Sequence, residues 1–545
     1  MQSISRGRLV TLVLTLACTL AATGCTQVRT GAGGRNPWTV AGVLRLGDIA
    51  EPDSLNPLLS TMDLSYDVSS LTFSYLIVAD GRGRLIGDLA TTVPGVANGG
   101  ISRDGRTYVY HLYRNVLWHD GARLTSRDVA FTWRTIMSSR NNVLHREGYQ
   151  EVTGIDTPDD ATLAVHLRRR YPPFVTQFFT TLQEGAKPVL PEHLLAHLSE
   201  INDAPYNALP IGSGPFRFAS WDRGQRIVLV ANDRYFRGPP HLRRIELRVA
   251  PDPNTLMTLM RTHEVDMPVG ASSLMYADFR TTPGFRVALS PWNSQSILAL
   301  NNSRPALRYV EVRRAIARAI DYDALIKKVW YGTARRARDI VPPTALGYLD
   351  QPPYPYAPAA AGAMLARAGW LPAPDGVRVR KGQRLELAMV IAAGGTSQAV
   401  GVQLQSMLRH IGIALILKAY PYHGIFAFDG PIVRGNYDLA LFANTLSYDP
   451  DNTARLGCDQ FAPKGENEVR YCDPTFDALE RAGLETDDPL RRAALYRAVA
   501  RRVRDTVPFI PLLMQNRITV ANSDLRGYDP SPVAAPWWNA RDWSM

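Results

Sequence analysis

Lysine is scarce in this chain. Only six of its 61 basic residues are lysine, and the arginines are spread over all 545 residues without a basic block that carries interleaved aromatics. A nucleic-acid-binding surface gathers its positive charge on one face or segment, so the formal net charge of +11 does not indicate such a surface. We therefore expect a solvated, arginine-rich surface and no nucleic-acid partner.

Long hydrophobic runs are missing too, except for one near the start. Residues 9–22 contain only apolar residues, threonine and one cysteine, and they follow Arg6 and Arg8. A membrane-spanning helix needs about 20 apolar residues, whereas the apolar region of a secretory signal needs about 7 to 15. We predict a signal peptide over residues 1–24 and no membrane-spanning segment in the rest of the chain.

The predicted signal peptide ends in small residues before a cysteine. Ala22-Thr23-Gly24-Cys25 resembles the lipobox of bacterial lipoproteins, where the chain is cut before the cysteine and acyl chains are attached to it. We predict lipidation of Cys25, a flexible lipidated spacer over residues 25–39, and an extracytoplasmic body that is lipid-anchored to the cell membrane. An ordinary signal cut nearby, or a plain core cysteine at this position, is the alternative.

Cysteine is also rare, with four in the chain. Cys18 lies in the predicted signal peptide and Cys25 takes the predicted lipid, which leaves Cys458 and Cys472 in an oxidising compartment. We predict a disulfide between these two, and closing the loop between them should stabilise the fold by roughly 3 kcal/mol. Two free buried thiols are the alternative.

Strand and helix patterns alternate along the chain. Strands are predicted at residues 43–46, 107–118 and 509–520. Thr125 with Asp128 three residues later predicts a variant capping box that starts a helix. Apolar residues at helical spacing predict another helix over residues 310–320, and Asp321 is placed to cap the next. The alternation predicts an α/β fold with mixed sheets.

Motifs of the common enzyme classes are missing. There is no G-x-x-x-x-G-K-[ST] phosphate loop and no G-x-S-x-G nucleophile motif, and Ile86 stands where a dinucleotide loop after Gly81 would need its third glycine. His193 and His197 have a metal-ligand spacing, but Glu192 precedes the pair and no third ligand is near. We expect no catalytic residue, no metal site and no cofactor, which favours a binding protein over an enzyme.

Five ordered segments together resemble one protein family. They are LRLGDIAEPDSLNP, GRTYVYHLYRNVLWHDGARLTSRDVAFTW, LPIGSGPFRFASW, LALNNSRPALRYVEVRRAIARAIDYDALI and YAPAAAGAMLARAGW. The second and fourth segments are long, with fixed spacing, and are the most specific evidence for the resemblance. The chain resembles the bacterial extracellular solute-binding proteins of family 5, the peptide and oligopeptide receptors of ABC importers.

The resemblance implies a periplasmic-binding-protein-like fold of type II, with two lobes and an extra N-terminal subdomain. Lobe I would cover residues 40–291, with the subdomain at roughly 70–200, lobe II residues 292–505, and residues 506–545 would return to lobe I. The hinge segments would lie near residues 286–296 and 505–515. Ligand would bind between the lobes, and the permease would distinguish the closed from the open form.

The resemblance also implies how a peptide or a similar small solute would be held. Members of the peptide type bind an extended ligand by main-chain hydrogen bonds, as an added strand. The matching edges here are Ala50, Glu51 and Pro52 in the first lobe, and Ala443, Asn444, Thr445 and Leu446 in the second. Many members place an aspartate, which pairs with the peptide's ammonium, at the position of Leu446. Asp449 or another acid would have to substitute, or the ligand has no amine there.

The expected partners follow from the family. They are the ligand, the permease and ATPase subunits of an ABC importer, and the membrane through the lipid anchor, with the protein itself a monomer. A non-peptide solute such as an oligosaccharide or a metal chelate, a secreted hydrolase on the same scaffold, and a sensor or adhesin without a permease remain the alternatives.

Overall fold

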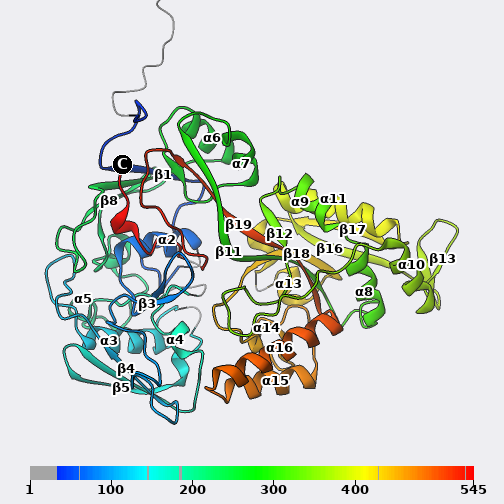
Figure 1. Cartoon of the computed structure of the whole chain (residues 1–545), viewed down its shortest axis with the longest axis horizontal. Coiled ribbons are helices and arrows are strands. Elements are labelled where there is room, and N and C mark those ends of the chain that lie inside the picture. The colour runs from blue at the N-terminus through cyan, green and yellow to red at the C-terminus, as the bar shows by residue number, and fades with distance from the viewer. Residues whose placement is uncertain (1–33, 61, 144–145, 183–186, 428, 534) are drawn as a thin grey trace, which may run out of the picture. The chain divides into compact units, whose positions relative to one another are not determined.

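Residues 34–545 are described by a computed structural model, except residues 61, 144–145, 183–186, 428 and 534 (Figure 1). Contacts divide the chain between Thr39 and Val40, and residues 40–545 form one compact unit. The predicted signal peptide, Cys25 and the greater part of the predicted spacer lie outside the described residues and stay predictions. Among the residues that are described, no helix is both long and apolar enough to cross a membrane.

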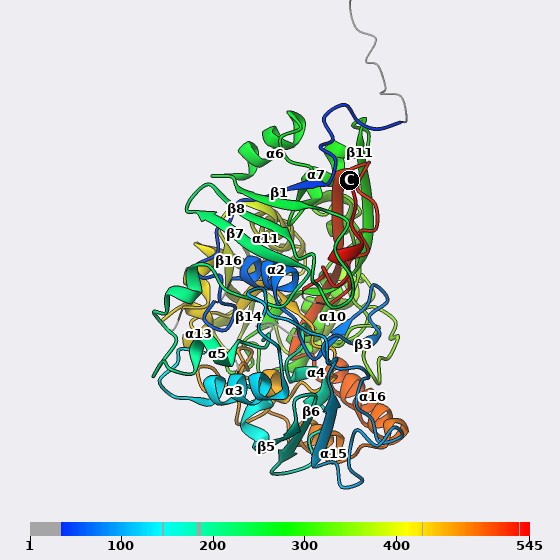
Figure 2. The same ribbon diagram turned by 90° about the vertical axis from the view of Figure 1, so that its left-hand side faces the viewer.

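A five-stranded sheet is built from the N-terminal half of this unit, in the order β10-β1-β9-β8-β7. β1 pairs in parallel with β9 and β10, while β7, β8 and β9 pair antiparallel. Leu44 and Leu46 alternate along β1 and are fully buried, as a strand with one face on the core requires. Helix α2 packs beside β7 (Figure 2). The bounds are β1 Val43–Asp48, α2 Asp63–Thr72, β7 Phe216–Asp222, β8 Arg226–Ala231, β9 Arg244–Val249, α6 Pro253–Arg261, β10 Met267–Pro268 and α7 Ser273–Phe279.

A second, antiparallel sheet in the order β4-β6-β5 belongs to the region where the extra subdomain is expected. The capping box is confirmed, because the Thr125 backbone N–H donates to Asp128 Oδ2 at 2.7 Å at the start of α3. The strand expected over residues 107–118 is shorter, because β4 ends at His111 and an exposed turn follows at Arg114 and Asn115. The bounds are β2 Ile77–Ala79, β3 Leu85–Gly87, β4 Thr107–His111, α3 Ser126–Met137, η1 Tyr149–Glu151, β5 Val152–Asp159, β6 Thr162–Leu167, α4 Phe174–Gln177, α5 Glu192–Leu195 and η2 Pro205–Ala208.

The largest sheet has six strands in the order β12-β19-β11-β18-β16-β17, on the right in Figure 1. It is mixed, because β16 pairs in parallel with β17 and β18 while β11 pairs antiparallel with β18 and β19. The α/β class with mixed sheets is thereby confirmed. The strands are β11 Phe285–Leu300, β12 Ala334–Arg336, β16 Glu386–Ala392, β17 Ala414–Tyr420, β18 Leu439–Thr445 and β19 Phe509–Asn522.

Helices surround this sheet, and a small sheet, β13-β14-β15, lies beside them. The predicted helix over residues 310–320 is present as α8, and Asp321 caps α9 by accepting from the Ala324 backbone N–H at 2.9 Å. The bounds are α8 Val310–Ala319, α9 Tyr322–Lys328, α10 Pro358–Arg367, β13 Leu371–Pro372, β14 Arg378–Arg380, β15 Gln383–Arg384, α11 Gly395–Arg409, α12 Tyr422–Ile425, α13 Pro431–Arg434, α14 Thr453–Leu456, α15 Pro474–Leu484, α16 Pro489–Thr506 and η3 Ala540–Asp542.

The two long strands β11 and β19 run side by side through the middle of the unit (Figure 1). Their pairing extends from Phe285 opposite Asn522 to Ala299 opposite Phe509, with a break between Pro291 and Gln295. At one end, Asn522 Nδ2 donates to Asp266 Oδ1 at 2.9 Å, beside β10. At the other end both strands lie in the six-stranded sheet. They cover most of the two predicted hinge segments, whose role as hinges remains a prediction.

The buried apolar residues fall into separate cores. One core is built by residues 44–267 together with C-terminal residues such as Leu525, Trp537 and Trp543, and two further cores lie within residues 297–513. The division into two lobes and the return of residues 506–545 to lobe I stay predictions. The expected disulfide between Cys458 and Cys472 is present.

Candidate functional site

Two cavities adjoin the C-terminal end of β18. The first cavity has a volume of about 320 Å³. It is lined by residues 269–273 after β10, by the strands β11 and β19, and by other residues of the six-stranded sheet and its helices, among which Ala443 is the last along β18. The second cavity, of about 210 Å³, is lined by Asn444, Thr445 and Leu446, by the loop that follows, and by residues of the N-terminal half such as Tyr171. The end of one strand therefore connects the two cavities.

That strand end has one open edge. β18 pairs with β11 over its whole length, from Leu439 to Thr445. On its other edge, β16 pairs only with Leu439 and Ala440, so residues 441–445 have no strand partner there in the described part of the chain. Ala443 is exposed, and Asn444 and Thr445 are partly exposed. An unpaired edge next to a cavity can accept an extended ligand as a further strand.

Aromatic, aliphatic and hydroxyl side chains line most of the first cavity. Trp292, Trp330, Phe426 and Phe442 line it together with Ser296 and other small polar residues. Such walls contact apolar groups over a large area, while a few polar groups set orientation.

One rim of the first cavity is held by hydrogen bonds between distant segments. Ser273 Oγ at the start of α7 lies 2.8 Å from Thr333 Oγ1, which also donates to the Trp330 backbone oxygen at 2.6 Å. The Asn516 side chain donates to the Thr333 backbone oxygen at 2.9 Å. These contacts join α7, β19 and the loop before β12.

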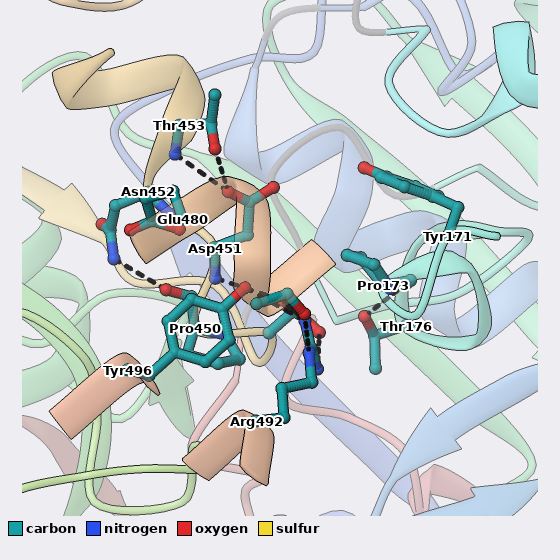
Figure 3. A network of polar contacts seen from close by, with 12 residues as sticks. Tyr171, Pro173, Thr176, Pro450, Asp451, Asn452, Thr453, Glu480, Arg492 and Tyr496 are labelled. Carbon is teal, nitrogen blue, oxygen red and sulfur yellow. Dashed lines mark hydrogen bonds and ion pairs between the residues drawn. The ribbon is translucent and has the colours of Figure 1, made fainter. Parts of the chain in front are cut away.

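The second cavity borders a network of acidic side chains and one arginine (Figure 3). Arg492 of α16 donates to both carboxylate oxygens of Asp449, at 2.9 and 2.8 Å, and both side chains are buried. Burial alone would lower the pKa of Arg492, but the Asp449 carboxylate outweighs it and raises that pKa. Both oxygens of Asp449 are thus engaged within the protein.

Two more carboxyl groups lie behind this pair. Asp451 Oδ1 accepts hydrogen bonds from the backbone N–H and the hydroxyl of Thr453, at 2.9 and 2.6 Å (Figure 3). Burial raises the pKa of Asp451, and burial together with the nearby Asp451 charge raises the pKa of Glu480. The region is rich in carboxyl groups. Hydrogen bonds within the protein engage Asp449 and Asp451, and burial favours the neutral, protonated forms of Asp451 and Glu480.

The structure brings five of the predicted ligand-binding residues together at these cavities. Ala443 lines the first cavity, and Asn444, Thr445, Leu446 and Asp449 line the second. Leu446 is buried and packs with Ala337 and Met514, while its backbone N–H donates to the Asn293 backbone oxygen at 2.7 Å. Leu446, the position at which the sequence resemblance implies an aspartate in other proteins, therefore makes an apolar contact here. The ligand contacts themselves remain predictions.

The three predicted residues of the first edge lie elsewhere. Ala50, Glu51 and Pro52 follow β1 and line neither of the two cavities. Glu51 Oε1 accepts hydrogen bonds from Trp221 Nε1 at 3.0 Å and from the Gly224 backbone N–H at 2.8 Å, which fixes it to the turn between β7 and β8. Their ligand-binding role stays an untested prediction.

Arg517 and Trp292 were not identified from the sequence. Both line the first cavity from β19 and β11, and the Arg517 guanidinium lies over the Trp292 ring at 4.8 Å from its centroid. The sequence contained one indication, because both residues lie within or just beyond the predicted hinge segments. Among the described residues, no group of three or more His, Cys, Asp or Glu side chains is placed to hold a metal ion.

Comparison with known proteins gives a consistent family match. The family model for "Bacterial extracellular solute-binding proteins, family 5 Middle" matches residues 88–459. The oligopeptide-binding protein AppA of Bacillus subtilis is 25% identical over 516 residues, which cover 92% of each chain. The solved structure of AppA with a nonapeptide has a TM-score of 0.77 at 24% identity, covering 92% of this chain and 98% of that one.

A second solved structure carries a different kind of ligand. NikZ of Campylobacter jejuni, in complex with Ni(L-His), has a TM-score of 0.79 at 23% identity and covers 93% of this chain and 100% of that one. The periplasmic-binding-protein-like fold of the present chain is thereby confirmed. The two ligands, a peptide and a metal chelate, show that similar folds accept different chemistry.

Proposed function

The chain belongs to the bacterial extracellular solute-binding proteins of family 5, and from that membership we propose that it is the ligand-capturing subunit of an ABC importer for peptides or similar small solutes. It would hold its ligand between the N-terminal half and the six-stranded sheet and deliver it to a membrane permease without altering a covalent bond. A ligand would stabilise the closed form only through a higher affinity for it than for the open form.

The observation that carries this proposal is the open edge of β18. Within the described part of the chain, residues 441–445 have a free edge between two cavities, and Ala443, Asn444 and Thr445 offer backbone groups there. Main-chain hydrogen bonds recognise an extended ligand without reading its side chains, which suits a receptor for varied peptides.

A non-peptide solute is the second candidate, and Leu446 favours it. A peptide ammonium next to Leu446 would face an apolar side chain, and both oxygens of the nearby Asp449 are already engaged by Arg492. A buried ammonium without a carboxylate would weaken binding. A solute without a free amine avoids this cost.

The location of the protein follows from the same proposal. We propose that the signal peptide is removed before Cys25, that Cys25 carries the lipid, and that the folded unit acts as a tethered monomer with the permease and ATPase subunits outside the cytoplasm. The family match supports an extracellular role.

Native mass spectrometry of the purified full chain tests the capture of a solute. We expect a co-purified small molecule, whose removal lowers the melting temperature and whose return restores it. A set of short peptides of graded length, added to the emptied protein, shows whether peptides replace that molecule. Chemical conversion of a bound peptide or solute by the pure protein, or the absence of any stabilising solute, would contradict the proposal.

A further inference from the structure

Arg517 is the one charged residue among the described residues that line the first cavity. All the other lining residues are apolar, aromatic, hydroxyl or amide side chains, or glycine. The second cavity differs, because Glu147, Asp449, Asp451 and Glu466 line it with a single arginine, Arg455. The first cavity therefore presents a positive charge inside largely neutral walls.

Only some of the hydrogen-bond donors of the Arg517 guanidinium have partners within the described part of the chain. Arg517 Nη2 donates to the Val533 backbone oxygen at 3.3 Å, and no ion pair of Arg517 occurs within the described part of the chain. Its Nε is buried and has no hydrogen-bond partner there. Burial lowers the pKa of Arg517, which reflects the cost of keeping this charge away from water.

The carboxyl groups that interact with Arg517 over a longer range belong to α2. Asp63 is exposed, and Asp67 is half-buried. Burial raises the pKa of Asp67 to about 8, so near neutral pH this side chain is mostly uncharged. Asp63 also acts on Arg517 only over a longer range, so no carboxylate of the described residues contacts this guanidinium directly.

We propose that Arg517, which lies over the Trp292 ring, anchors a carboxylate of the ligand inside the first cavity. The ligand chemistry that fits is a carboxylate joined to an apolar or aromatic group, because Phe426 and Phe442 line the same space and its volume is about 320 Å³. The planar guanidinium matches a carboxylate in shape and charge, and the cation–π contact with the indole ring favours its present position. The inference rests on the proposed capture function and specifies the ligand class for that same site.

The test compares two small probes that differ in one group. The carboxylate 3-phenylpropionate and its neutral amide, 3-phenylpropionamide, are titrated into the purified full chain by calorimetry and followed by the fluorescence change of tryptophan. We expect the carboxylate to bind at least about tenfold more tightly than the amide. Equal affinities, or no binding of the carboxylate at millimolar concentration, would overturn the inference, and this comparison requires no variant.

Two variants of Arg517 test whether this residue causes the preference for the carboxylate over the amide. Arg517→Gln is expected to lower the carboxylate affinity by about tenfold or more and to leave the amide unchanged. Arg517→Lys keeps the charge but loses the planar fork, so an intermediate affinity is expected. Arg335→Gln is the matched control, because Arg335 is an exposed arginine on β12 that does not line the first cavity. Wild-type affinity in Arg517→Gln, or an equal loss in Arg335→Gln, would contradict the assignment.

The result separates this inference from the proposed function. If the protein captures a co-purified solute but shows no preference for the carboxylate probe, only the carboxylate-binding role of Arg517 is contradicted. If the protein prefers the carboxylate probe but captures neither a co-purified solute nor a peptide, the carboxylate-binding role of Arg517 is supported and the proposed function is contradicted.

Discussion

Arg170 Nε lies 2.9 Å from Asp487 Oδ2, and this ion pair joins the segment after β6 to the turn between α15 and α16. β6 belongs to the core of the N-terminal half, whereas α16 belongs to a core within residues 297–513. Leu484, at the end of α15, also packs against the first core. The ion pair is thus part of a direct contact between the two halves from which the predicted lobes are formed.

Asp487→Asn is expected to weaken ligand binding slightly. Both side chains of the pair are partly exposed, so the pair contributes about 0.2 to 1 kcal/mol, and losing it from a closed form lowers affinity by about 1.4-fold to fivefold. Titration calorimetry at low and high salt measures this, and the effect should shrink at high salt. Asp278→Asn, which breaks the Arg261–Asp278 pair within the N-terminal half, is the control and should leave affinity unchanged. Equal losses in both variants would refute a role in closure.

Arg492→Ala is expected to lower the free energy of unfolding by about 3 to 5 kcal/mol. The substitution leaves the buried Asp449 carboxylate without its partner, and a buried unpaired charge is costly. Denaturant unfolding followed by circular dichroism gives the value. Arg338→Ala removes one partner of the exposed pair with Asp350 and should cost no more than about 1 kcal/mol. A similar small loss in both variants would show that the buried pair does not stabilise the fold.

Leu446→Asp tests the departure from the family pattern. A carboxylate placed among Ala337 and Met514 should lower the free energy of unfolding by about 2 kcal/mol or more, and more than the neutral Leu446→Asn does. A dipeptide with a free amine should then raise the melting temperature of the Asp variant more than its N-acetylated form does. If the two dipeptides act alike, this position does not face a ligand amine.

Binding of a carboxylate ligand is expected to depend on pH through Asp67. The groups that act electrostatically on Asp67 are Arg517, Asp63 and Asp48, and Tyr75 and Tyr528 also interact with it. An anion at Arg517 favours the protonated form of Asp67, whose pKa without ligand is about 8. Affinity should therefore be highest below about pH 8 and fall as the pH rises through it, with uptake of a proton on binding.

Calorimetry in buffers of different ionisation enthalpy measures that proton. Asp67→Asn, which cannot ionise, should remove both the proton uptake and the loss of affinity above about pH 8. Proton release on binding, or the same pH profile in the variant, would contradict the role of Asp67.

Cys25→Ser is expected to release the protein from membranes into the soluble fraction. A single residue carries the predicted lipid anchor, and without it no apolar segment of sufficient length is expected to remain after signal cleavage. Fractionation of cells followed by immunoblotting gives the distribution. Cys458→Ser, which breaks the disulfide and leaves Cys25 intact, serves as the control and should stay with the membrane. Membrane retention of the Cys25→Ser protein would refute the lipobox assignment.

Local elements could be predicted where their own residues determine them. The capping pair of Thr125 and Asp128, the apolar spacing in α8 and the long strand β19 depend on neighbours in sequence. β4 is shorter than its alternation indicated, because an exposed turn interrupts it after His111. Alternation alone does not show where a strand leaves its partner.

The site could be predicted less well, because its chemistry is assembled from distant segments. Ala443 to Leu446 were found through resemblance to a family, and they do line the cavities. The engagement of Asp449 depends on Arg492 from a different helix, and the placement of Arg517 over Trp292 depends on the pairing of β19 with β11. Neither relationship leaves a pattern in the local sequence.

The position of Trp537 and Trp543 in the first core has a consequence for biosynthesis. These residues fill a core whose other members are mostly residues 44–267, so that core lacks two of its largest buried side chains until translation has passed residue 543. Contacts between such remote positions form slowly, and the incomplete core exposes apolar surface until they have formed. Under the proposed export, such a chain gains from remaining unfolded until the residues that complete this core have crossed the membrane.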